Sequence, residues 1–264
     1  MRACLAVGVL FCAVFLATAV PAETPEEKGQ EIAEEADRRD LGWGDFRGNM
    51  KMVLKNQQGQ VSERQLRMQG LENPSSDEGD KSMVIFDEPR DVKGTALMTY
   101  THILVPDDQW LFLPALKRVK RISSSNKSGP FVGSEFAYED LTSQEVEKYS
   151  YKWQREEPCG SLTCFVVERY PLYENSGYTR QTVWIDRDEY RPQKVEYYDR
   201  KNELLKTLTL TDYKKYLAKH WRAHTLTMVN EQTGKSTTLS WSGYEFKVGL
   251  TDEDFTETTL KRMR

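Results

Sequence analysis

Histidine is scarce in this sequence of 264 residues, which contains three, and no long apolar run follows residue 22. The hydrophobic share of 38% and the charged share of 30% describe a polar chain, which excludes a protein with several membrane-spanning helices. No GxSxG elbow, P-loop or HExxH motif occurs. This shortage of nucleophiles, acid–base pairs and metal ligands argues against an enzyme, a metal site or a bound cofactor.

The first 22 residues have the pattern of a secretory signal peptide. An apolar run from Cys4 to Val20 follows Met1 and Arg2, and it ends in the small-residue sequence Val20-Pro21-Ala22. We predict cleavage after Ala22, which leaves residues 23–264 as one domain. An uncleaved membrane anchor is the alternative, but the run is short for a bilayer and no stop-transfer charges follow it.

Cleavage would remove one arginine and two of the four cysteines. The remaining 36 basic and 41 acidic residues give a net charge of −5, which makes nucleic acid a poor partner. Cys159 and Cys164 are then an even pair in an exported chain, and we predict a disulfide between them. Their spacing does not fit a CxxC redox motif, and two thiols alone are a weak case for zinc.

The mature chain has a helical start followed by a long series of strands. Residues 26–41 have helical periodicity, and Thr251 to Asp254 resemble the capping box of a second, short helix. Alternating patterns predict strands at 46–56, 60–69, 81–87, 95–105, 109–113, 117–122, 148–156, 162–169, 179–187, 192–199, 203–211, 220–229 and 236–246. Most connections are short, so neighbouring strands should be antiparallel. A filled small barrel and a half-open curved sheet with helices over its concave side both fit this pattern.

The three histidines carry little evidence of chemistry. His220 and His224 would meet on a helix, but their surroundings alternate as a strand does, which separates them by roughly 13 Å. His102 lies in the predicted strand 95–105, where a structural histidine is more common than a catalytic base.

Large apolar side chains share single faces of several predicted strands. Ordinary core packing is one interpretation, and the lining of a cavity for an apolar guest is the other. The candidate lining residues are Met50, Met52, Trp110, Phe112, Tyr149, Tyr151, Trp153, Leu204, Leu208, Leu210, Leu239 and Trp241.

One local excess of positive charge occurs at Lys117, Arg118, Lys120 and Arg121. On a strand these side chains alternate between two faces, so they do not form a single stripe. A solvated sheet edge that discourages aggregation is one interpretation, and docking to an acidic partner or to phospholipid headgroups is the other.

Four sequence blocks resemble a known family. FDEPRDVKGTAL at 86–97, QWLFLPALKRVKRI at 109–122 and PFVGSEFAYEDL at 130–141 resemble signatures of the LolA-like outer membrane lipoprotein-sorting family. They are most similar to a branch found beside lipid exporters of the resistance-nodulation-division (RND) type. The run WIDRDEYRPQKVEYYDRKNELLKTLTLTDY at 184–213 resembles the two-hairpin core shared by the LolA and LolB carriers.

This resemblance implies a mainly β fold, an incomplete antiparallel barrel with a helical lid. It also implies a periplasmic carrier that holds acyl chains of lipids or lipoproteins on its concave face and shuttles them towards the outer membrane. An RND-type transporter of the inner membrane and an outer-membrane acceptor are the implied partners. The lid helix 26–41 and the loops 70–80 and 123–138 are expected to move.

Two alternatives remain open at the level of sequence. The first is an accessory protein of an RND-type lipid exporter that docks through the basic residues 117–121 and carries no cargo. The second is a hydrolase whose site the sequence does not reveal.

Overall fold

A computed structural model of the protein describes residues 22–73 and 78–262. Nearly all of the predicted signal peptide therefore lies outside the described residues. The helices are α1 (Pro25–Asp40) and α2 (Glu257–Arg262). The strands are β1 (Asp45–Lys55), β2 (Val61–Leu71), β3 (Glu78–Glu88), β4 (Ala96–His102), β5 (Asp108–Leu113), β6 (Arg118–Arg121), β7 (Tyr149–Cys159), β8 (Leu162–Pro171), β9 (Arg180–Asp186), β10 (Pro192–Tyr198), β11 (Leu204–Tyr216), β12 (His220–Asn230) and β13 (Ser236–Phe246).

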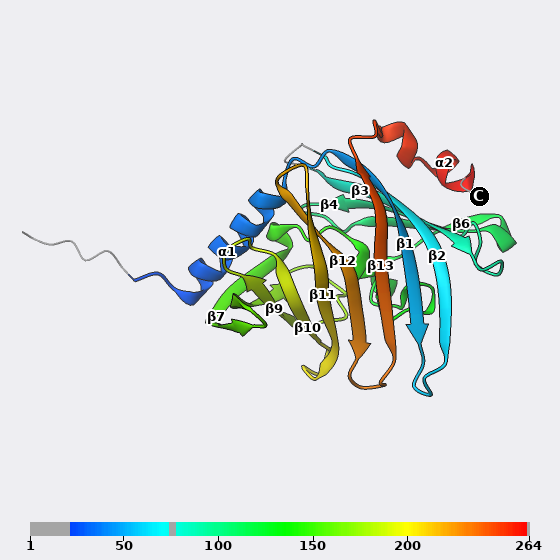
Figure 1. The fold of residues 1–264 in the computed structure, drawn as a ribbon. Coiled ribbons are helices and arrows are strands. Elements are labelled where there is room, and N and C mark those ends of the chain that lie inside the picture. Colours follow the sequence, from blue (N-terminus) through cyan, green and yellow to red (C-terminus); the bar gives the residue numbers. More distant parts are fainter. Residues whose placement is uncertain (1–21, 74–77, 263–264) are drawn as a thin grey trace, which may run out of the picture.

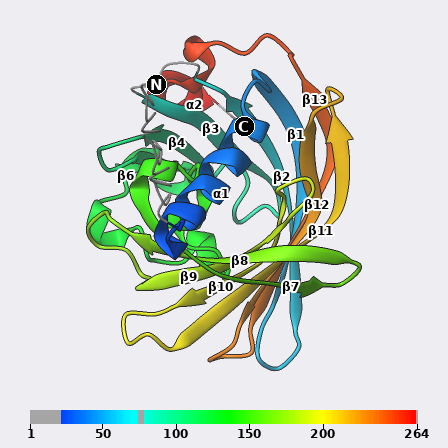
Figure 2. The same ribbon diagram turned by 90° about the vertical axis from the view of Figure 1, so that its left-hand side faces the viewer.

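All of these strands belong to one antiparallel sheet with the order β6-β5-β4-β3-β2-β1-β13-β12-β11-β10-β9-β8-β7. Sequential strands are neighbours except for β6 and β7, which lie at opposite ends of the sheet, and the pairing of β1 with β13 joins the two halves of the meander. The sheet curls strongly, but its outer strands β6 and β7 do not pair with each other (Figures 1 and 2). The predicted half-open barrel is confirmed, and the closed small barrel is wrong.

The turns explain why the strands follow each other so closely. The β1–β2 hairpin, for example, closes through a hydrogen bond of 3.0 Å from the Gly59 amide to the Asn56 carbonyl. Gly59 has a φ of +82°, a conformation that glycine adopts without the Cβ penalty of other residues. The predicted disulfide between Cys159 and Cys164 is also present, at the tip of the β7–β8 hairpin.

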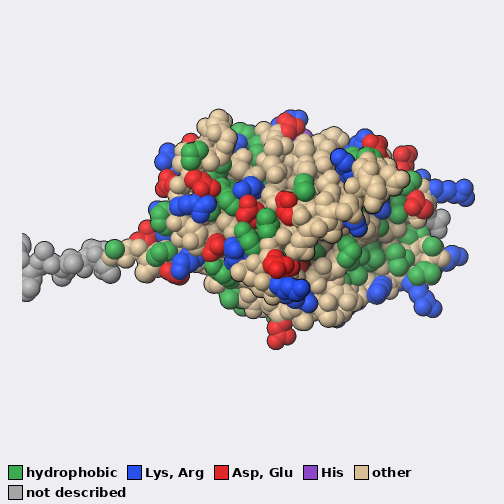
Figure 3. Space-filling view, turned by 90° about the horizontal axis from the view of Figure 1, so that it is seen from below, with side chains coloured by type: hydrophobic (Ala, Val, Ile, Leu, Met, Phe, Trp, Pro, Cys, Tyr) green, Lys and Arg blue, Asp and Glu red, His purple; other side chains and the backbone are tan. Residues whose placement is uncertain are grey.

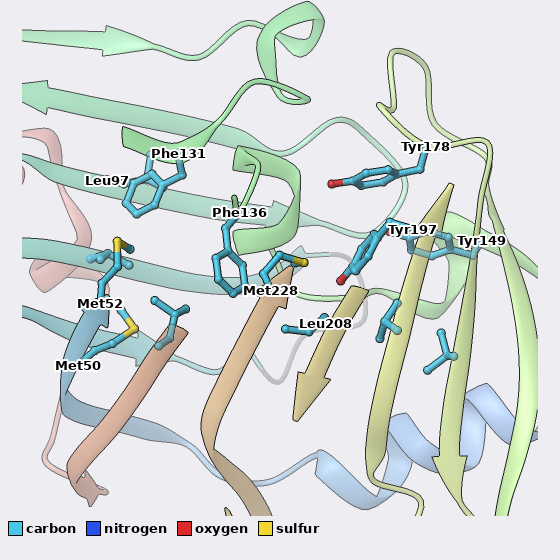
Figure 4. Close-up of a cluster of buried hydrophobic side chains, with 14 of the residues drawn as sticks. Met50, Met52, Leu97, Phe131, Phe136, Tyr149, Tyr178, Tyr197, Leu208 and Met228 are labelled. Carbon is cyan, nitrogen blue, oxygen red and sulfur yellow. The ribbon is translucent and has the colours of Figure 1, made fainter. Parts of the chain in front are cut away.

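The main core lies on the concave side of the sheet (Figure 4). Met52, Leu97 and Met228 point into it from separate strands, and each is 2% exposed or less. Phe131 and Phe136 reach the same core from the long connection between β6 and β7. The concave side is therefore partly filled by the chain's own connecting segment.

This connection, residues 122–148, includes the segment 123–138 that was expected to move as a loop. It contains four 3₁₀ turns, at Ser124–Asn126, Phe131–Gly133, Tyr138–Leu141 and Val146–Lys148. Phe131 is 1% exposed and Phe136 is 3% exposed, so its middle part packs as core. We call residues 130–141 the plug segment, and its burial argues against the movement expected for 123–138.

A second, smaller core lies under the C-terminal segment. Phe255 and Leu260, both 0% exposed, pack with Met83 and Met98 of β3 and β4. The predicted capping box is present, because the Asp254 carboxylate accepts a hydrogen bond of 2.9 Å from the Thr251 amide. Neither described helix has an apolar run long enough to span a bilayer.

Candidate functional site

Helix α1 crosses the open side of the barrel and docks on the edge strand β7 (Figure 2). Its start is fixed by a capping box, in which the Glu27 amide donates to Thr24 Oγ1 at 3.1 Å. Gly29 lies directly on β7: a Cβ built there would be 2.7 Å from the backbone nitrogen of Trp153. Glycine thus permits the helix to cover the hydrogen-bonding edge of the sheet.

The C-terminal end of α1 is held by two turns on the other side of the opening. Asp40 pairs with Arg222 of β12 at 2.5 Å, and Arg39 Nη1 donates to the Asp188 carbonyl at 2.7 Å. Lys219 also donates to the Leu41 carbonyl. The helix therefore spans the opening from β7 at its N-terminal part to the β9–β10 and β11–β12 turns at its C-terminal end.

A cavity of about 1320 Å³ lies between α1 and the concave face of the sheet. This exceeds the roughly 300–1000 Å³ of most small-molecule sites. Its apolar wall includes Val167, Val183, Ile185, Leu210 and Leu226. Such a space suits a long apolar guest better than a compact polar metabolite.

The structure divides the candidate lining residues into groups. Three line the cavity: Tyr151, Leu210 and Trp241. Six belong to the main core beside it: Met50, Met52, Tyr149, Leu208 and Leu239, with Trp153 packed against them.

Three candidates lie elsewhere. Trp110 and Phe112 belong to the second core with Phe255 and Leu260, away from the cavity. Leu204 is half-buried, and a register shift of the β10–β11 pair occurs beside it. The bulge interrupts the alternation on which its placement with Leu208 and Leu210 was based.

Several cavity residues were missed by sequence reasoning. Val167, Val183 and Ile185 lie in near-continuous apolar strands, where alternation gives no face. Arg169 of β8 also lines the cavity. A signal for it existed: it stands two residues after Val167 and four after Phe165, at the inward positions of the strand.

Carboxylates gather where α1 meets the segment just before β7. Burial, with neighbouring carboxylates, raises the pKa of Glu145 to about 7 and that of Asp80 to about 6. Burial likewise raises the pKa of Asp37 on α1. All three line the cavity, and each favours its protonated form more than a free carboxyl does.

A buried polar network holds the plug segment on the sheet. Lys206 of β11 donates to Asp140 at 2.5 Å and to the Glu135 carbonyl at 3.0 Å. Tyr178 Oη donates to the same carboxylate at 2.8 Å. Because Lys206 and Asp140 are both about 95% buried, removing one partner would leave an unpaired charge in the core.

The basic residues 117–121 lie on and beside β6, which is an outer strand of the sheet. All four basic residues are exposed, and Arg121 also forms an ion pair with Asp108. Basic side chains stand out at this end of the molecule in Figure 3. The position of these basic residues on an outer strand fits the first interpretation, a solvated sheet edge.

The histidines lie as predicted on strands. His220 and His224 are both on β12, and His102 ends β4, with its Nε2 3.2 Å from Asp108. Within residues 22–73 and 78–262, no group of His, Cys, Asp and Glu side chains is arranged to hold a metal ion.

Comparison with solved structures shows the class of protein. A domain from Vibrio parahaemolyticus, named for outer membrane lipoprotein sorting, is 56% identical, with a TM-score of 0.87. The alignment covers 90% of this chain and 100% of that chain. A DUF1329 family protein from Desulfovibrio piger is 28% identical, with a TM-score of 0.85 and the same coverage of both chains.

A LolA superfamily protein from Nitrosomonas europaea shares the fold, with a TM-score of 0.69 and 22% identity over 90% of this chain and 99% of that one. A family model with the description "Uncharacterized protein" matches residues 78–262. Among curated proteins there is no match. The chain belongs to the same family as the outer membrane lipoprotein-sorting domain from Vibrio, and it has the fold of the LolA superfamily.

Proposed function

We propose that the protein is a periplasmic carrier that binds acyl chains of lipids or lipoproteins and shuttles them towards the outer membrane. The cavity of about 1320 Å³ between α1 and the apolar concave face carries this proposal. The lipoprotein-sorting name of the Vibrio relative supports it. The apolar run before Ala22, as a signal peptide, would place the protein in the periplasm.

The energetics of such a carrier are favourable. Each buried methylene contributes about 0.8 kcal/mol, so ten of them contribute roughly 8 kcal/mol before the costs of binding. A net free energy of about 8 kcal/mol would give a dissociation constant of about 1 μM, so after the costs of association ten buried methylenes alone give weaker binding than this. The lipid would be held in transit and would still be released to a membrane or receptor.

Entry of an acyl chain requires α1 to move, because the helix spans the opening. Its contacts with the β9–β10 and β11–β12 turns are few and polar. The Asp40–Arg222 pair is open to water on one side, with Asp40 53% exposed and Arg222 17% exposed, so we expect it to contribute little more than the about 0–1 kcal/mol that is typical of surface pairs. We therefore expect the C-terminal end of α1 to open first and the Gly29 end to remain docked.

The test is the binding of a fluorescent fatty acid and a fluorescent phospholipid to delipidated protein. Ala36→Phe places a ring in the cavity from the α1 side, because Ala36 lines it. Glu34→Phe, on the exposed side of the same helix, is the matched control. We expect wild type and Glu34→Phe to bind, and Ala36→Phe to bind at least about tenfold more weakly.

Failure of both wild type and the control to bind any acyl ligand would contradict the carrier. That result would favour an accessory protein that docks to an exporter, because β6 presents its basic side chains at the sheet edge. Charge reversal at Lys117, Arg118, Lys120 and Arg121 separates the two functions. A carrier should keep its lipid binding after this change, and loss of export with intact lipid binding would assign the docking role to β6.

A further inference from the structure

Arg169 occupies an unusual position on the concave face. It lies on β8 opposite Tyr151 of β7 on one side and Gln181 of β9 on the other. It also lines the cavity together with Tyr151 and Val167. A guanidinium thus stands beside the apolar part of the wall formed by Val167, Val183 and Ile185.

The partners of Arg169 are neutral. Its Nε donates to Gln181 Oε1 at 2.8 Å, and its guanidinium carbon is 5.0 Å from the centre of the Tyr149 ring. Among the described residues it has no carboxylate within ion-pair distance. The other arginines of the cavity are paired: Arg39 with Glu35 at 2.6 Å, Arg191 with Asp186 at 2.7 Å and Arg222 with Asp40 at 2.5 Å.

The guanidinium of Arg169 has donors that the described residues of the protein leave unused. The guanidinium carries five N–H donors in a planar fork that matches a carboxylate or a phosphate. Gln181 uses one of these donors, and no other hydrogen bond from Arg169 to the described residues is present. Arg169 is half-buried, so its guanidinium has lost part of its contact with water without gaining a counter-charge, and an anionic ligand would supply that charge.

We propose that Arg169 anchors the anionic group, a carboxylate or a phosphate, of an acyl lipid whose chain lies along Val167, Val183 and Ile185. This deepens the proposed function and rests on it. The ligand class thereby narrows from any acyl chain to an anionic lipid.

Acidic groups of α1 and of the segment before β7 line the same cavity as Arg169. Asp37 of α1 and Glu145 and Glu147 before β7 line the same space. Burial raises the pKa of Glu145 to about 7 and also raises that of Asp37, which lowers the negative charge opposite the ligand near neutral pH. The anionic group should therefore sit on the β8 side of the cavity.

The experiment compares three ligands of equal chain length on the delipidated full mature chain at neutral pH. Palmitate carries a carboxylate, hexadecyl phosphate carries a phosphate, and hexadecanol is neutral. Binding is measured by displacement of a fluorescent probe. Arg169→Gln removes the charge, Arg169→Lys keeps it, and Arg180→Gln is the control, since Arg180 pairs with Glu168 and does not line the cavity.

We expect wild type and Arg180→Gln to bind an anionic ligand at least about tenfold more tightly than the alcohol. Arg169→Gln should bind all three equally, and Arg169→Lys should keep part of the preference. Preference for palmitate identifies a fatty acid, and preference for the alkyl phosphate identifies a phospholipid headgroup.

Two results would overturn the assignment. Equal binding of the acid, the phosphate and the alcohol by wild type would refute the role of Arg169 while leaving the carrier function intact. Binding of none of the three would remove the carrier function and this proposal with it. The wild-type comparison does not depend on the folding of any variant.

Discussion

Replacement of Gly29 by alanine tests how the lid helix is attached. A Cβ at this position would lie 2.7 Å from the Trp153 nitrogen and 2.8 Å from the Lys152 nitrogen. Ordinary contacts of carbon are about 3.5–4.0 Å, so α1 must move away from β7 by roughly 1 Å. Both contact atoms belong to the backbone of a strand, which cannot rotate aside as a side chain can.

Two effects of opposite sign determine the size of the change. Alanine favours an isolated helix over glycine by about 1 kcal/mol. Overpacking of a well-packed contact costs typically about 1–3 kcal/mol. We therefore expect the docked state of α1 to lose about 1 kcal/mol net, which raises its open population about fivefold.

Hydrogen exchange measured by mass spectrometry on peptides from 25–40 is the assay. In Gly29→Ala, amide hydrogen exchange should be faster in the peptides from 25–40 and unchanged in β11–β13. This variant should also take up fatty acid faster than wild type. Glu31→Ala, an exposed change on the same helix, should have little effect. Slower exchange of α1 in Gly29→Ala would mean that helix propensity dominates, and it would refute the close docking on β7.

Three further predictions concern stability. Because burial raises the pKa of Asp80 from 3.8 to about 6 and that of Glu145 from 4.5 to about 7, the native state binds more protons across this window. These groups should therefore add stability as pH falls from neutral to about 5, and Asp80→Asn with Glu145→Gln should flatten that rise in urea midpoints. Replacing Cys159 and Cys164 by serine should cost about 2 kcal/mol from loop entropy, with unchanged lipid binding because neither lines the cavity; weaker binding would contradict this. Asp140→Asn should cost about 3–5 kcal/mol in denaturant unfolding because it leaves Lys206 buried and unpaired, whereas Glu63→Gln in an exposed pair should cost at most about 1 kcal/mol.

The order of the strands could be predicted because each strand carries its own signal. Alternation and short turns locate each strand, although the end of β11 at Tyr216 lies five residues beyond the predicted 211, and an antiparallel meander follows from connections too short to cross the sheet. The half-open shape came from the family resemblance, since periodicity alone fits a closed barrel equally well. The α1 helix was predicted within one or two residues of Pro25–Asp40.

The faces of the strands could not be predicted as well. Trp110 and Phe112 alternate as cleanly as Met50 and Met52, but α2 and the 3₁₀ turn before it cover the other side of β3–β5. A strand buried on both faces gives no sign of which one is concave. The structure accordingly places Tyr151 at the cavity and Trp110 in the second core.

The plug segment was missed for a different reason. Its apolar residues are mixed with one glycine, one serine and three acidic residues in no helical or strand-like repeat, and its burial depends on long-range partners. Lys206 lies 66 residues from Asp140, so no local pattern reports their contact. Burial of this kind is set by tertiary structure and can be seen only in coordinates.

The most direct test of the carrier is native mass spectrometry of the mature protein taken from the periplasm, followed by solvent extraction and lipid analysis. We expect a stoichiometric acyl-containing ligand that is released on extraction, and this ligand should carry an anionic group if Arg169 acts as proposed. A protein that is isolated empty and that takes up neither fatty acid nor phospholipid after delipidation would contradict the carrier function.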